Sequence, residues 1–159
     1  MKICNKQKKF GFKFIIYSIF TIYILTLIYI VLLKNGDSLV FEFMRKQSLN
    51  EKLSHAQIIP FLTIKELIFE PISYSISIKN LLGNIIIFSP LGFLLPIVFS
   101  KLNSLRKIFP IVLLSSLIIE LIQLFTGFGT FDIDDLILNT LGGIIGYYLY
   151  KLFSKKIIK

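Results

Sequence analysis

Long uncharged, apolar stretches alternate with short charged ones along this chain. The clearest stretch covers residues 14–33 and is bounded by Lys13 and Lys34. Because the hydrocarbon core of a bilayer is about 30 Å thick, about 20 apolar residues in a helix can cross it. Similar stretches follow at residues 80–99, 108–125 and 133–153. The pattern predicts an all-α, polytopic membrane protein, a bundle of four transmembrane helices.

The first stretch has a competing interpretation as a secretory signal peptide, because five lysines lie before or at its start. The apolar part of a signal peptide is usually about 7–15 residues long and is followed by a small-residue cleavage site. The stretch here is longer, and residues 33–37 (Leu-Lys-Asn-Gly-Asp) offer no such site. We therefore expect a retained first span.

Residues 34–79 form the expected outer loop between the first two spans. Two capping-box patterns lie within it, Ser48-x-x-Glu51 and Thr63-x-x-Glu66. Each predicts the start of a short helix, the first ending before Pro60 and the second at Pro71. Such short amphipathic helices suit the membrane interface. Residues 73–78 alternate like a strand but have no visible partner, so we expect a loop there.

Composition agrees with membrane insertion. Of 159 residues, 55% are hydrophobic and 17% are charged, and the mean hydropathy is +0.78, whereas a soluble domain has about 25% charged residues. The net charge of +9 would ordinarily suggest nucleic acid as a partner, but a lysine surplus in a membrane protein reports topology. We therefore expect no nucleic-acid partner.

Positive charge also predicts orientation. Twelve of the 18 lysines and arginines lie in the amino-terminal tail, in residues 100–107 and at the carboxy-terminal end, whereas residues 126–132 have none. The positive-inside rule then predicts a multi-pass protein of the cytoplasmic (cell) membrane with both termini in the cytoplasm. The chain divides into a basic tail (1–13), a transmembrane domain (14–153) and a second basic tail (154–159).

The chain contains few residues that could bind a metal ion or form a disulfide. Cys4 is the single cysteine and His55 the single histidine, which excludes a disulfide framework and disfavours zinc or iron–sulfur sites. No cofactor is expected, and the lipid bilayer is the expected partner.

The strongly polar residues that we single out within the predicted spans share one property, since this topology places them in the outer half of the membrane. A charged side chain at mid-bilayer costs about 2.5–3.5 kcal/mol, so such residues usually face the bundle interior and often mark function. The predicted polar cluster consists of Asn84, Glu120, Gln123, Asp135 and Asn139. The candidate catalytic residues are Glu120, Asp132, Asp134 and Asp135. A less favoured alternative is that Asp132, Asp134 and Asp135 supply oxygen ligands to Mg²⁺.

Structural roles compete with these functional ones. Asp132 or Asp134 can cap the start of the fourth span, and the amide side chains can hydrogen-bond between helices. Gly142-x-x-x-Gly146 permits close helix approach. The residues expected to serve packing are Pro90, Gly92, Pro96, Gly142 and Gly146.

Three motifs, taken in order, resemble the VanZ-like family. They are Asn84-Ile-Ile-Ile-Phe-Ser-Pro-Leu-Gly-Phe-Leu-Leu-Pro96, Glu120-Leu-Ile-Gln123 and Phe131-Asp-Ile-Asp-Asp-Leu-Ile-Leu-Asn-Thr-Leu-Gly142. Residues 59–61 (Ile-Pro-Phe) resemble the family's "LIPF" element, and the resemblance covers residues 14–152. Many members carry an arginine shortly before the aspartates, whereas residues 127–130 here read Gly-Phe-Gly-Thr.

The resemblance implies a role in the bacterial cell envelope. The family's namesake is associated with low-level antibiotic resistance to teicoplanin, a lipid-tailed glycopeptide that binds cell-wall precursors outside the membrane. A non-enzymatic protein that lowers susceptibility by binding a lipid-linked envelope precursor or lipoglycopeptide is the first hypothesis. An alternative is an intramembrane enzyme that acts on a lipid head group or cell-wall intermediate through Glu120 and the Asp132/Asp134/Asp135 cluster. A small transporter or accessory subunit is the third.

Overall fold

The computed structural model describes residues 2–30, 39–69 and 74–157, and these residues form seven helices. The helices are α1 (Lys2–Ile28), α2 (Leu39–Lys46), α3 (Leu49–Ser54), α4 (Leu62–Phe69), α5 (Tyr74–Val98), α6 (Leu105–Thr126) and α7 (Ile133–Ile157). Within the described ranges the only strand-like feature is an isolated bridge between Gln57 and Asp132. The all-α prediction is therefore confirmed.

Three helices are long and apolar enough to cross a membrane. Their spanning segments are Leu81–Val98, Leu105–Thr126 and Ile133–Ser154, close to the second, third and fourth predicted spans. In α1 the described apolar segment, Lys13–Ile28, is shorter than a full span. Residues 31–33, the end of the predicted first span, lie outside the described residues.

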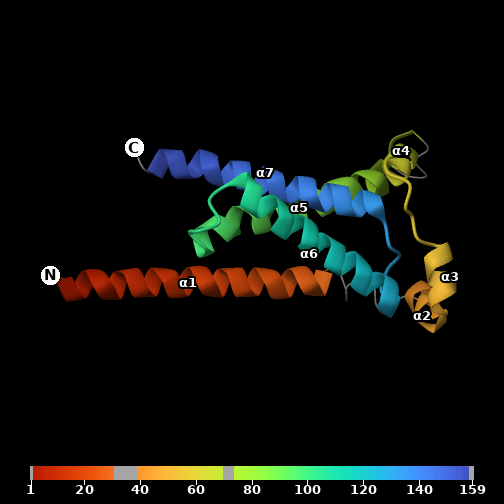
Figure 1. Cartoon of the computed structure of the whole chain (residues 1–159), viewed down its shortest axis with the longest axis horizontal. Coiled ribbons are helices and arrows are strands. Elements are labelled where there is room, and N and C mark those ends of the chain that lie inside the picture. The colour runs from red at the N-terminus through yellow and green to blue at the C-terminus, as the bar shows by residue number, and fades with distance from the viewer. Residues whose placement is uncertain (1, 31–38, 70–73, 158–159) are drawn as a thin grey trace.

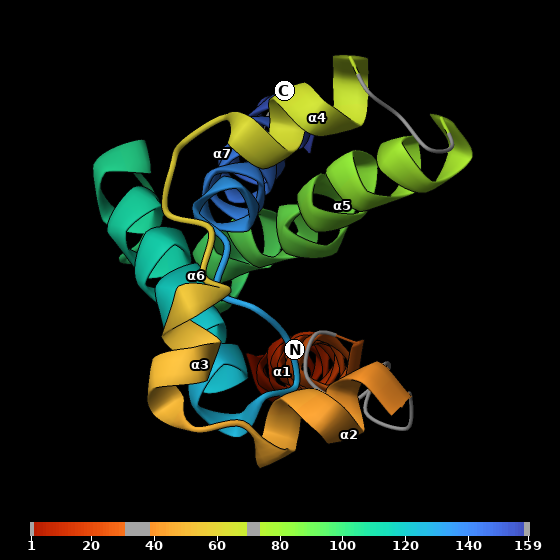
Figure 2. The ribbon, with the colours of Figure 1, turned by 90° about the vertical axis from the view of Figure 1, so that its right-hand side faces the viewer.

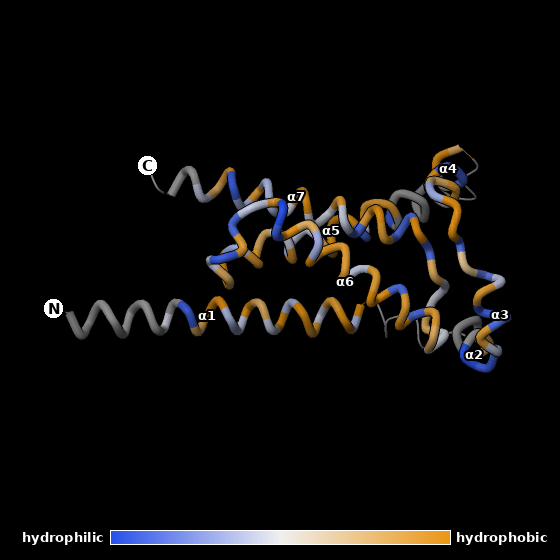
Figure 3. The backbone as a smooth tube through the Cα atoms, viewed as in Figure 1, coloured by the Kyte–Doolittle hydropathy of each residue, from blue (hydrophilic) through white to orange (hydrophobic). Residues whose placement is uncertain are grey.

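The long helices alternate in direction along one axis. Figure 1 shows both ends of the chain and the α5–α6 turn on one side, and α2, α3 and α4 at the opposite end. Polar segments gather at α2 to α4 and at the α5–α6 turn, with apolar helices between them (Figure 3). We call the end that carries α2, α3 and α4 the outer end, and the end that carries the chain termini the terminal end.

Direct backbone contact joins α5 to α7. A Cβ atom added to Gly92 would collide with the carbonyl oxygen of Gly143, and one added to Gly146 would collide with the carbonyl oxygen of Ser89. Gly142 meets the backbone of α5 in the same way. Glycine is therefore required at these positions, because any side chain would force the two helices apart.

A buried apolar core holds α1 and α6 against this pair. Its buried members are Leu27, Phe88, Leu91, Leu95, Ile108, Val112, Ile119 and Tyr147. α1 lies on the opposite side of the bundle from α7 (Figure 2) and packs mainly on α5. There the Tyr23 hydroxyl donates to the carbonyl of Ile87 at 2.9 Å, and Phe20 stacks edge-on against Phe99 with ring centroids 6.0 Å apart.

The first predicted capping box is confirmed. The Ser48 hydroxyl accepts the backbone N–H of Glu51, and the Glu51 carboxylate accepts the backbone N–H of Ser48 at 2.6 Å. These hydrogen bonds from the backbone and hydroxyl of Ser48 to the carboxylate hold the pKa of Glu51 below its ordinary value. Local sequence alone therefore sets the start of α3.

Two local predictions are wrong. Thr63 is not a cap, because it lies inside α4, which begins at Leu62. Residues 74–78 are not a loop, because α5 begins at Tyr74. No proline lies between Tyr74 and Pro90, so the alternating serines and isoleucines extend the helix. α5 also stays continuous through Pro90 and Pro96, although each proline removes one backbone hydrogen bond.

Replacing a contact glycine by alanine should destabilise the bundle. Gly92→Ala and Gly146→Ala are expected to lower the free energy of unfolding by about 1–3 kcal/mol, because the added methyl group overpacks the α5–α7 contact. Thermal unfolding in detergent, followed by circular dichroism, measures this change.

Gly83→Ala is the matched control in α5. A Cβ there would meet nothing within 4 Å, and alanine favours helix over glycine by about 1 kcal/mol, so stability should stay the same or rise. Equal losses at Gly83 and Gly92 would contradict the packing argument.

Candidate functional site

The chain between α3 and α4 lies beside the chain that leads into α7. The N–H of Gln57 donates to the carbonyl of Phe131 at 2.8 Å, and the N–H of Ile133 donates to the carbonyl of Gln57 at 2.9 Å. Figure 2 shows the two connecting segments running together at the outer end. This pairing fixes residues 57–61 over the start of α7.

Asp134 is fully buried and binds the first turn of α4. Its Oδ1 accepts the backbone N–H of Phe61 at 2.5 Å, and its Oδ2 accepts that of Ile64 at 3.0 Å. Amides at a helix start have no partner within the helix and favour a negative charge. Asp134 therefore supplies the cap that the sequence pattern assigned to Thr63. The backbone at Phe61 takes a left-handed φ of 65° as the chain enters this contact.

Lys52 makes a matching contact at the end of α6. Only 7% of Lys52 is exposed, and its Nζ donates to the carbonyl of Phe125 at 3.0 Å. That helix closes at Gly127, whose φ of 73° is left-handed and whose N–H donates to the carbonyl of Gln123. A cation favours the negative end of a helix. The buried lysine therefore fastens the outer segment to α6.

Glu120 lies beneath the start of α7, with 2% of its surface exposed. Its Oε2 accepts the backbone N–H of Asp132 at 3.0 Å. The side chain of Asp132 in turn accepts the N–H of Asp134 at 2.7 Å, as an N-cap residue does.

Two further polar pairs connect the spanning helices. The side-chain amide of Asn84 in α5 donates to Oδ1 of Asp135 in α7 at 2.5 Å. One turn further along α7, the amide of Asn139 donates to the hydroxyl of Ser116 in α6 at 3.0 Å, and both residues are buried. Among the described residues nothing hydrogen-bonds to Oδ1 of Asn139. α7 is thus tied to both of its neighbours by amide side chains.

The polar site, as we call it from here on, brings together most of the predicted residues. It consists of Asn84, Ser116, Glu120, Asp132, Asp135 and Asn139. The Gln123 side chain lies against Gly129, with its Nε2 3.1 Å from the position that a Cβ on Gly129 would take. Asp134 faces α4 instead. Ser116 was missed by sequence reasoning, although its spacing of four residues from Glu120 places both on one helix face.

The expected packing residues lie along α5 and α7. Gly92, Gly142 and Gly146 lie at the contact between these helices, and Pro96 is buried while Pro90 is half-buried. Lys52, by contrast, was not foreseen, because no local pattern distinguishes a lysine that reaches a distant helix end from one in solvent.

Chemically, the polar site offers carboxylate oxygens and amide groups beneath a covering segment. Glu120 and Asp135 can accept protons or hydrogen bonds from a bound polar group. The carboxylate of Asp134 is occupied by the α4 amides, which removes it from any shared acid–base set. Over the described parts of the chain, no three His, Cys, Asp or Glu residues are placed to hold a metal ion, so the aspartates gain no support as Mg²⁺ ligands.

Asp134→Asn should loosen the start of α4. Hydrogen bonds to a charged group contribute about 1.5–3 kcal/mol, so amide exchange at Phe61 and Ile64 is expected to accelerate by about tenfold or more. Hydrogen–deuterium exchange with fragment analysis measures this rate.

Asp135→Asn provides the control, because the neighbouring carboxylate bonds to Asn84 and not to α4. Exchange at Phe61 and Ile64 should keep its wild-type rate in that variant. If both variants left these amides protected, Asp134 would not be the cap of α4.

Comparison with known proteins identifies the family of this architecture. A family model described as VanZ/LLP1 matches residues 20–154. Protein VanZ of Enterococcus faecium is 33% identical over 135 residues, which cover 84% of this chain and 72% of that protein. No solved structure matches the chain. The matched region contains the three spanning segments of α5, α6 and α7 and the whole polar site, and the chain belongs to the VanZ/LLP1 family.

Proposed function

We propose that this chain is a multi-pass protein of the bacterial cytoplasmic membrane that lowers susceptibility to lipid-tailed glycopeptides of the teicoplanin type. The observation that carries the proposal is the polar site at the outer end, where Glu120 is buried beneath a segment held by Asp134 and Lys52. Membership of the VanZ/LLP1 family supports it. The site then faces the side of the membrane on which such glycopeptides act.

The proposal includes four spans with both termini in the cytoplasm. The apolar segment of α1 is followed by Tyr-Ile-Val-Leu-Leu at residues 29–33, which makes the combined stretch long enough to cross a bilayer. All nine acidic residues fall within residues 37–70 or 120–135, the segments that this topology assigns to the outer side. Twelve of the 18 basic residues fall in the segments assigned to the cytoplasm.

Cys4 allows the orientation to be measured directly. Because it is the only cysteine, a membrane-impermeant maleimide should leave the chain unlabelled in intact cells and label it after permeabilisation. A Cys4→Ser/His55→Cys variant is the control, since His55 is exposed in the outer segment and should react in intact cells. Labelling of Cys4 before permeabilisation would overturn the proposed orientation.

The surroundings of the polar site suit an amphipathic ligand. Ile58, Ile59 and Phe61 are all exposed, and they adjoin the start of α7 because Gln57 pairs with Asp132 there. An acyl tail can lie on these apolar side chains while a polar head group approaches the half-buried Asp135. A lipid-linked envelope precursor or a lipoglycopeptide has this combination of tail and head.

Susceptibility testing of Glu120 variants examines the proposal. Deleting the gene should raise susceptibility to teicoplanin several-fold and change that to vancomycin less, because vancomycin lacks the lipid tail. Complementation with Glu120→Gln should fail to restore resistance, since the substitution removes a buried carboxylate from the site. Minimum inhibitory concentrations of the two drugs, measured separately, give the result.

Glu66→Gln is the matched control, because Glu66 is exposed on α4 and its loss of charge should leave resistance unchanged. Membrane levels of each variant are checked by immunoblotting. Unchanged susceptibility to both drugs after deletion would contradict the function. Full rescue by Glu120→Gln and by Asp135→Asn would contradict the role of the carboxylates, including any acid–base role.

A further inference from the structure

A groove lies at the terminal end of the bundle, far from the polar site. α5 ends at Val98, and the turn that follows leaves a hollow of about 420 Å³ lined by residues 98–102. A second hollow of about 280 Å³ adjoins it, lined by Lys13, Ile16 and Tyr17 of α1 and by Ile97, Val98 and Ser100. The two hollows share Val98 and Ser100, and we call them together the turn groove.

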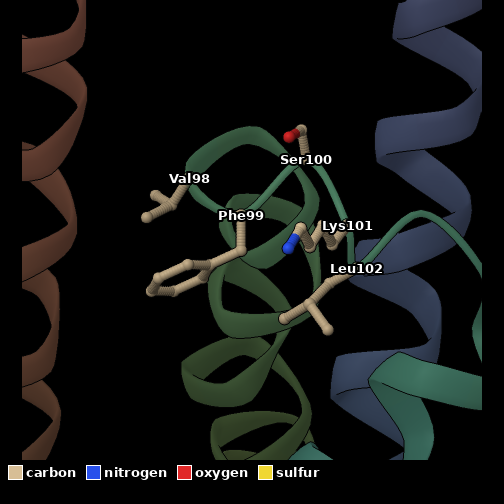
Figure 4. A pocket seen from close by; sticks show the side chains of 5 residues that line it. All are labelled: Val98, Phe99, Ser100, Lys101 and Leu102. Carbon is tan, nitrogen blue, oxygen red and sulfur yellow. The ribbon is translucent and has the colours of Figure 1, made fainter.

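The floor of the turn groove is apolar. Figure 4 shows Val98 and Phe99 extending toward α1, with Ser100 at the top of the turn. Phe99 is 45% exposed although it also contacts Phe20 of α1. Ile16 and Ile97 continue this surface between the two helices. The floor therefore offers an extended apolar strip along the α1–α5 contact.

Cations surround the rim of the same groove. Lys13 and Lys101 line it and are exposed. The ammonium group of a third lysine, Lys107, donates a hydrogen bond to the carbonyl of Lys101 at 2.7 Å. This contact brings another positive charge to the turn. In the part of the chain that the structure describes, the one ion pair joins Lys46 to Glu42 in α2, at the opposite end. The lysines of the groove are thus not neutralised by carboxylates.

Sequence explains why no carboxylate is nearby. Residues 1–36, 71–119 and 136–159 contain no aspartate or glutamate, and these ranges supply every element at the terminal end. A groove with an uncompensated positive rim has charge complementarity for an anion. A small hydrated anion would contact the lysines of the rim but leave the apolar side chains of the floor uncovered. A ligand that carries both an anionic group and an apolar group matches the groove better.

Depth in the membrane identifies the anion. The apolar segment Lys13–Ile28 begins at this groove, and the apolar segment Leu81–Val98 ends there. In a bilayer, the floor of the groove then lies at the level of the acyl chains and its rim at the level of the head groups. Lysine side chains commonly extend from such a position to the interface. Basic pockets between spanning helices bind anionic lipid head groups.

We propose that the turn groove binds an anionic phospholipid of the adjacent leaflet. Lys13 and Lys101 contact its phosphate, and an acyl chain lies on Ile16, Ile97 and Phe99. Because α1 packs mainly on α5, a lipid in this position contacts both helices and strengthens their association. This binding site is separate from the polar site and does not depend on the function proposed for it.

Native mass spectrometry of the full-length chain tests the proposal. The protein is released from nanodiscs that contain phosphatidylglycerol and phosphatidylcholine, and the lipid retained is titrated. A lysine near an anionic surface contributes about 1 kcal/mol, which corresponds to roughly fivefold in affinity. Lys13→Gln or Lys101→Gln should therefore weaken phosphatidylglycerol binding roughly fivefold, and the double variant roughly thirtyfold. Both lysines are exposed, so the variants should fold.

Lys151→Gln is the matched control. Lys151 lies at the same end on α7, over the ring of Tyr147 at 5.7 Å, and does not line the groove. Its loss should leave lipid binding unchanged, and an equal effect at Lys151 would show unspecific charge attraction and overturn the proposal. Equal retention of phosphatidylcholine would do the same. Displacement by soluble glycerol phosphate at concentrations similar to those of the lipid would indicate a phosphate site without a lipid and also overturn it.

Discussion

Two helices can bring their backbones together only where neither carries a Cβ, and α5 and α7 meet this condition at Gly92, Gly142 and Gly146. In a bilayer, helices gain no hydrophobic free energy by associating, so close van der Waals packing and hydrogen bonds must hold them. The glycine contact sets how far α7 is shifted along α5. That shift places Asp135 opposite Asn84, and Asn139 of the same helix then reaches Ser116 in α6. The contact glycines, which carry no functional group of their own, thus position the side chains of the polar site.

Helix ends explain the burial of two charged side chains, Asp134 and Lys52. Asp134 lies at the positive end of α4, and Lys52 lies at the negative end of α6. Each charge is compensated by aligned peptide dipoles, and neither needs an oppositely charged side chain. Because these two contacts hold the outer segment, they account for charges that would otherwise look functional. Glu120 and Asp135 remain as the carboxylates that join spanning helices, since Glu120 of α6 accepts the N–H of Asp132 before α7, and Asp135 of α7 accepts the side-chain amide of Asn84 in α5.

The sequence predicted what depends on neighbouring residues and missed what depends on distant ones. Hydropathy located the spanning parts of α5, α6 and α7, and a local motif located the start of α3. The start of α4 was placed at Thr63, because its true cap, Asp134, is 73 residues from Phe61 in the chain. A sequence pattern cannot assign different roles to Asp132, Asp134 and Asp135. Their separate roles arise only because a helix start, a backbone amide and an asparagine approach them from different directions.

Charge in this molecule is separated along the membrane normal. The acidic residues that the structure describes lie toward the outer end, and residues 1–36, 71–119 and 136–159, which supply the terminal end, contain lysines and arginines but no aspartate or glutamate. The protein is therefore an electric dipole whose axis follows the membrane potential. Moving one elementary charge through 100 mV changes the free energy by about 2.3 kcal/mol. In the orientation proposed above, with the terminal end in the cytoplasm, an energised membrane that is negative on its inner face attracts that end. Collapse of that potential would weaken the electrical contribution to insertion without changing a single contact inside the bundle.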